Sequence, residues 1–68
     1  MSKQYLIGEV ATIQQFIAFG VILEEAQQDG DVVNNAFVKD GYLHITICHS
    51  DSTISYIEVD STGDTSTV

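Results

Sequence analysis

Residues 35–48, NAFVKDGYLHITIC, decide the fold of this chain. Asp40-Gly41 predicts a two-residue type I′ hairpin turn, because both central residues of that turn need positive φ. Over residues 42–48 apolar residues alternate with polar or aromatic ones, which is typical of a strand with one buried face. The stretch therefore predicts two antiparallel strands, over residues 35–39 and 42–48. The face expected to be buried carries Leu43, Ile45 and Ile47, and the opposite face carries Tyr42, His44, Thr46 and Cys48.

A third strand is expected after this hairpin. Residues 53–60 are rich in β-branched and aromatic side chains, which favour strands. They follow a polar turn at residues 49–52. Three consecutive strands joined by short turns form an antiparallel meander.

One helix is expected before the hairpin, over residues 10–28. Thr12 followed by Gln15 matches a capping box, in which two side chains satisfy backbone N–H groups of the first turn. Gly30 is suited to a left-handed C-cap. The segment before the helix allows two interpretations. Residues 5–7 form a short edge strand that ends at Gly8, or they extend the helix; Gly8 would cost that longer helix about 1 kcal/mol, so the strand is favoured.

The expected fold is α+β, with one helix packed on a three-stranded antiparallel sheet and the N-terminal segment as a candidate fourth strand. Residues 1–60 form the single domain, and the small polar residues 61–68 form a flexible tail. The helix is expected to contribute Ile13, Phe16, Ile17 and Val21 to the core, and the sheet Leu43, Ile45, Ile47, Ile57 and Val59.

Composition excludes several classes of function. The chain has ten carboxylate side chains, two lysines and no arginine, which gives a net charge of −8 over 68 residues. Direct nucleic-acid binding needs cations that displace counterions from phosphates, and an anionic membrane surface would repel the chain. A basic partner would be attracted. Cys48 is the single cysteine, the longest apolar run is short for a membrane span, and no signal peptide is evident, so a cytoplasmic location is expected.

Candidate catalytic and metal-binding residues lie close together between residues 44 and 51. On a strand, His44 and Cys48 are about 13 Å apart and His49 points to the opposite face, so the three do not converge on one metal ion. Ser50, His49 and Asp51 are neighbours in sequence, whereas a catalytic triad needs side chains that converge in space. We therefore expect no enzyme activity, no metal and no cofactor.

Two features point to binding. Glu24, Glu25, Asp29 and Asp31 lie at the C-terminal end of the expected helix, where the helix dipole disfavours negative charge. They form either a solvated surface or a patch that docks on a basic protein. The second feature is the helix face left over by the expected packing. It is either covered by the loop at residues 31–35 or by the N-terminal strand, or it forms an oligomer interface, such as that of a homodimer. The candidate partner-binding residues are Glu24, Glu25, Asp29, Asp31, Asp51, Glu58 and Asp60, and the candidate oligomer interface is Phe19, Ile22 and Leu23.

In its size, acidity and α+β architecture the whole chain resembles the small phage-encoded anti-CRISPR proteins. The resemblance is one of type and carries no residue over by position. It implies an acidic inhibitor that mimics nucleic acid and blocks DNA binding by a basic CRISPR-Cas effector, in the cytoplasm of a bacterial host. The alternatives are a homo-oligomeric structural or adaptor module and an antitoxin-like or immunity-like protein.

Overall fold

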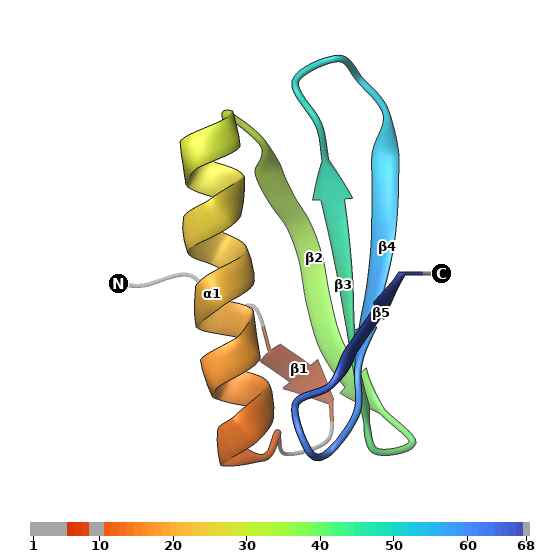
Figure 1. The fold of residues 1–68 in the computed structure, drawn as a ribbon. Coiled ribbons are helices and arrows are strands. Elements are labelled where there is room, and N and C mark those ends of the chain that lie inside the picture. Colours follow the sequence, from red (N-terminus) through yellow and green to blue (C-terminus); the bar gives the residue numbers. More distant parts are fainter. Residues whose placement is uncertain (1–5, 9–10, 68) are drawn as a thin grey trace.

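The structure is a computed structural model that describes residues 6–8 and 11–67. Its sheet has the strand order β1-β2-β3-β4-β5, with β1 parallel to β2 and every other pair antiparallel. α1 lies on one face of this sheet, so the domain has two layers (Figure 1). The expected α+β class and meander are confirmed. The elements are β1 (Leu6–Gly8), α1 (Ile13–Asp29), β2 (Val32–Lys39), β3 (Tyr42–Cys48), β4 (Ile54–Val59) and β5 (Thr65–Thr67).

The N-terminal segment forms a strand, as the first of the two interpretations expected. β1 pairs in parallel with residues 36–38 of β2. The parallel direction follows from the chain order, since α1 crosses over between the two strands. Tyr5 and Val10, which the sequence analysis placed in the strand and the helix, lie outside the described residues.

The turns and caps are those that the sequence predicts. Asp40 and Gly41 have φ of 54° and 81°, as a type I′ turn requires. Thr12 and Gln15 form the capping box at the start of α1. Gly30 has φ of 76° and donates its N–H to the carbonyls of Ala26 and Gln27. These local signals set where β2, β3 and α1 begin and end.

The C-terminal residues differ from the expected flexible tail, because residues 65–67 form β5 and pair with residues 57–59 of β4. A turn at residues 60–63 reverses the chain. Asp60 holds it by accepting hydrogen bonds from the backbone N–H of Thr62 and Asp64 and from the Thr62 hydroxyl. Gly63 has φ of 93°, a conformation that favours glycine. The small polar residues after Val59 therefore include a turn as well as a strand.

The sheet side of the core matches the expectation, and the helix side does not. Leu43, Ile45, Ile47 and Val59 are buried, with Ile57 packed against them. The helix residues expected in the core are exposed: Ile13 by 72 %, Phe16 by 53 %, Ile17 by 64 % and Val21 by 54 %. The buried face of α1 carries Gln15, Phe19, Ile22 and Ala26 instead.

Gln15 explains why α1 turns this face inward. Its side chain is 1 % exposed. Its amide nitrogen donates to the backbone carbonyls of Gly41 at 3.0 Å and Val59 at 3.1 Å, while its oxygen accepts from the N–H of Thr12 at 2.9 Å. The helix is apolar on both sides, so hydrophobicity alone does not choose between them. The hydrogen bonds of Gln15 to the β2–β3 turn and the end of β4 make the choice.

Candidate functional site

The structure separates the acidic residues into groups at the two ends of the domain. Asp31 accepts a hydrogen bond from the backbone N–H of Ser50, so the C-terminal end of α1 lies beside the β3–β4 turn. Glu24, Glu25, Asp29 and Asp51 are exposed in this region. We call these four residues the acidic end. Among residues 6–8 and 11–67 the single lysine is Lys39. It is the last residue of β2, beside the β2–β3 turn and away from the acidic end.

Asp60 does not belong to the acidic end, although the sequence analysis placed it in the same candidate site. The Thr12 hydroxyl donates to the carbonyl of Ser61 at 2.9 Å, which places the β4–β5 turn beside the N-terminus of α1. Asp60 therefore lies about one helix length, roughly 25 Å, from the C-terminus of α1. Glu58 lies elsewhere again, on the sheet face that α1 does not cover.

Two of these carboxylates are held by their own turns. The hydroxyl and backbone N–H of Thr53 donate to Asp51, and these hydrogen bonds lower the pKa of Asp51. The hydroxyl of Thr62 has the larger part in lowering the pKa of Asp60, followed by the N–H of Asp64. Hydrogen bonds to the charged form of a carboxylate favour that form. Both groups therefore keep their charge into more acidic solution than a free aspartate does.

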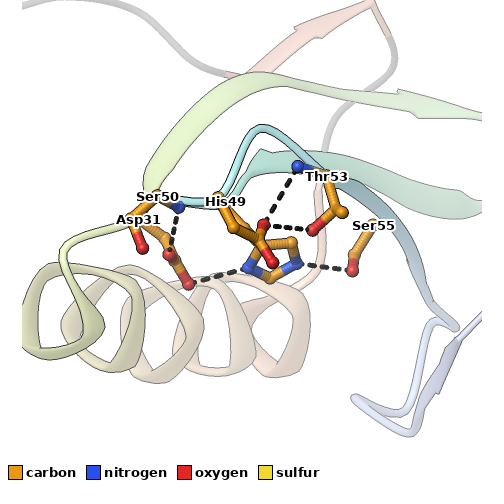
Figure 2. A network of polar contacts seen from close by, with 6 residues as sticks. Asp31, His49, Ser50, Thr53 and Ser55 are labelled. Atoms are coloured by element: carbon orange, nitrogen blue, oxygen red, sulfur yellow. Dashed lines mark hydrogen bonds and ion pairs between the residues drawn. The ribbon is translucent and has the colours of Figure 1, made fainter.

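Asp31, His49 and Ser55 form a hydrogen-bonded chain that the sequence analysis missed (Figure 2). His49 Nδ1 lies 2.9 Å from Asp31 Oδ2, and His49 Nε2 lies 2.6 Å from Ser55 Oγ. Because a carboxylate only accepts hydrogen bonds, Nδ1 carries a proton. In the neutral ring Nε2 then accepts the hydroxyl proton of Ser55, which is the arrangement of a catalytic triad.

The surroundings of this chain of side chains disfavour acyl transfer. Such a reaction needs N–H donors or positive charge where an oxyanion develops. Asp31 lies just beyond the carbonyl end of α1, which carries partial negative charge, and Asp29 and Asp51 add two carboxylates nearby. We therefore interpret the three residues as a structural latch that fixes the β3–β4 turn to the end of α1.

The latch predicts unequal effects of two substitutions. Asp31→Ala should lower the free energy of unfolding by about 1–3 kcal/mol, because it leaves His49 and the Ser50 N–H without their acceptor. Ser55→Ala, which removes a single hydroxyl, should cost about 1 kcal/mol or less. Urea denaturation measures both values. Equal losses, or hydrolysis of an activated acetyl ester that Ser55→Ala abolishes, would contradict the interpretation.

The exposed apolar side of α1 is a second surface feature. Ile13, Phe16, Ile17 and Val21 lie at helical spacing on the side away from the sheet. We call these four large residues the outer stripe. A Cβ added at Gly20, which lies between them, would meet no atom within 4 Å outside the helix's own backbone. The oligomer interface expected from the sequence is corrected here, because Phe19 and Ile22 are buried in the core and Leu23 is partly buried.

The sheet face opposite α1 carries a shallow hollow of about 260 Å³. Its walls come from neighbouring positions of the three central strands, where Phe37 pairs with His44, His44 with Glu58, and Thr46 with Tyr56. The Phe37 and His44 rings stack with centroids 5.0 Å apart. The residues that line the hollow are Phe37, His44, Ile45, Thr46, Tyr56, Ile57 and Glu58.

Within residues 6–8 and 11–67, no three His, Cys, Asp or Glu side chains are grouped so that they could hold a metal ion. α1, the helix of this part of the chain, is not long and apolar enough to cross a membrane. Comparison with protein-family models, with curated proteins and with solved structures finds no match.

Proposed function

We propose that this protein is an acidic binding module that occupies the nucleic-acid-binding surface of a basic protein, with a CRISPR-Cas effector as the candidate target. The observation that supports it best is the acidic end, where four exposed carboxylates lie at one end of the domain. Lys39, the lysine among the described residues, lies at the other end. In this proposal the carboxylates stand in for backbone phosphates. Two of them lie within the last two turns of α1 and one at its last residue, where the helix dipole gives them no stabilisation.

The rest of the charge supports the same proposal. With a net charge of −8, the chain attracts a cationic groove over a long range and speeds the encounter with it. Because Asp60 lies far from the acidic end, one partner surface is not expected to contact both. Docking through one end of the molecule would involve Glu24, Glu25, Asp29 and Asp51, with Asp31 holding the turn in place.

Displacement of DNA tests this function. A purified CRISPR-Cas effector is loaded with a fluorescent DNA duplex, and the protein is titrated in while anisotropy reports bound DNA. We expect displacement at low salt that weakens steadily through a salt series, because screening reduces the attraction between exposed charges. Displacement that is independent of salt, or no displacement at any salt, would contradict the proposal for this target.

Charge reversal at the acidic end should separate binding from folding. Glu24→Lys with Glu25→Lys should raise the concentration needed for half displacement at least about tenfold, because two attractive charges become repulsive. Stability should stay equal or rise slightly, since lysine complements the C-terminal dipole of α1. Urea denaturation and the anisotropy assay measure the two quantities.

A matched control removes the same charge from each end. Glu24→Gln with Glu25→Gln and Asp40→Asn with Asp64→Asn both change the net charge by two units. The first pair lies at the acidic end and the second at the opposite end. Displacement should weaken more for the first pair. Equal weakening would mean that total charge alone drives binding and that the acidic end has no special part.

The outer stripe favours a second candidate function, a homo-oligomeric adaptor. Four large apolar side chains more than half exposed on one helix are a typical interface feature. Four such residues cover less than the roughly 800 Å² per partner that a stable dimer usually buries, so further contacts would be needed. Light scattering at high concentration decides: a strict monomer excludes this candidate.

A further inference from the structure

We infer that the hollow on the sheet face opposite α1 binds the side chain of an arginine from the basic partner. The inference rests on the proposed function for the nature of the partner, and on the shape and chemistry of the hollow for the site. Its walls combine aromatic rings, from Phe37 and Tyr56, with the carboxylate of Glu58. Among residues 6–8 and 11–67, none of those that line the hollow is a lysine or arginine.

The chemistry of these walls matches a guanidinium group. A planar cation stacks on aromatic faces through cation–π attraction. The same group pairs with a carboxylate through two parallel N–H donors, which an ammonium group does not offer. Tyr56 is 54 % exposed and the Glu58 side chain 38 %, so an incoming side chain can reach both.

The strands hold Glu58 in place for this contact. Glu58 lies on β4 between His44 of β3 and Ser66 of β5. Its Oε2 is 3.6 Å from His44 Nδ1, and the His44 ring is fixed in turn by its stack on Phe37, with an angle of 20° between the ring planes. The pairing of β3 with β4 therefore places Glu58 beside His44 on this sheet face.

The size of the hollow favours one side chain over a larger ligand. Its volume of about 260 Å³ lies below the roughly 300–1,000 Å³ of pockets that bind drug-sized molecules. Its position also agrees with docking by a basic protein. The β3–β4 hairpin carries most of the lining residues on its strands and Asp51 in its turn. A partner that lies along this hairpin contacts the hollow and one residue of the acidic end together.

Peptide titration followed by ¹H–¹⁵N NMR tests the site. The probes are three capped tripeptides, glycine-X-glycine, in which X is arginine, lysine or citrulline. We expect the arginine peptide to give saturable shifts of the Thr46, Tyr56 and Glu58 amides. Citrulline keeps the shape without the charge and should give no shifts at these amides. Lysine binding as tight as that of arginine, or shifts spread over all acidic residues, would overturn the inference.

Single substitutions locate the contact. Glu58→Gln should weaken arginine binding about tenfold, because it removes a charge-assisted pair. Tyr56→Ala should weaken it through the loss of the stacking surface. Asp40→Asn is the control, since it removes one negative charge from the β2–β3 turn, outside the hollow and the acidic end, and should leave the affinity unchanged. Because all three side chains are partly or fully exposed, the spectra of the variants should keep the dispersion of a folded protein. Equal affinities for Glu58→Gln and the wild type would overturn the site.

The outcome separates the hollow from the proposed function. If the protein displaces DNA from the effector and Glu58→Gln displaces it equally well, the hollow fails and the function survives. If the arginine peptide binds through Glu58 but no DNA is displaced, the hollow stands and the function fails for that target. The two assays therefore give independent answers.

Discussion

Gln15→Glu should remove a large part of the stability of the folded protein at neutral pH. The side chain of Gln15 is almost fully buried, and its amide nitrogen donates to the carbonyls of Gly41 and Val59. A carboxylate has no proton to donate, so it would place a buried negative charge against two carbonyl oxygens. The expected loss is at least about 4 kcal/mol, because an unpaired buried charge costs more than a lost neutral hydrogen bond. A chain of 68 residues has a total stability on the order of 3–10 kcal/mol.

The pH dependence of this variant follows from the same contacts. Burial beside two acceptors raises the pKa of the introduced carboxyl in the folded state above its unfolded value. Stability is therefore greatest below the unfolded pKa, where the neutral acid can donate one hydrogen bond, and falls as the pH rises. Circular dichroism with urea at several pH values measures this trend. Gln14→Glu is the control: it makes the same chemical change at the exposed neighbouring position and should change stability by about 0.5 kcal/mol or less. If the two variants unfold alike, Gln15 does not hold the helix.

Phe19→Ala and Phe16→Ala should differ by several kcal/mol, although both remove a phenylalanine ring from α1. Phe19 is 7 % exposed and belongs to the core, whereas Phe16 is 53 % exposed on the outer stripe. Truncating a buried phenylalanine leaves a cavity and costs about 3–5 kcal/mol. Truncating an exposed one usually changes stability by about 0.5 kcal/mol or less.

This pair measures directly which side of α1 faces the sheet. Because the two residues share type, helix and neighbourhood, differences in helix propensity cancel between them. Thermal unfolding of both variants under one set of conditions gives the comparison. Similar losses for the two variants, or a larger loss for Phe16→Ala, would mean that the helix packs through the face expected from the sequence.

The sheet could be predicted from the sequence because its signals are local. Asp40-Gly41 sets the β2–β3 turn through the φ angles of two neighbouring residues, and the alternation in β3 follows from neighbouring side chains. The orientation of α1 could not be predicted in this way. It depends on Gln15 meeting carbonyls 26 and 44 residues further along the chain. Because the polar Gln15 is one of the buried residues of α1, the hydrophobic pattern of the sequence does not indicate the buried face.

The latch was missed for a similar reason. Asp31 lies 18 residues before His49, and the two meet only because the end of α1 lies beside the β3–β4 turn. His49 pairs with Asp31 and Ser55 and not with its sequence neighbours Ser50 and Asp51. By contrast, the separation of Asp51 from Asp60 was available from the sequence. They flank the same strand, β4, so they must lie at its opposite ends.

The outer stripe has a consequence for handling the protein in acid. At neutral pH, mutual repulsion between copies with a net charge of −8 keeps these apolar side chains from meeting. As carboxylates gain protons the repulsion fades, while the hydrophobic attraction between stripes does not. We therefore expect copies to associate through the outer stripe near the isoelectric point of about 4.1, where the net charge vanishes.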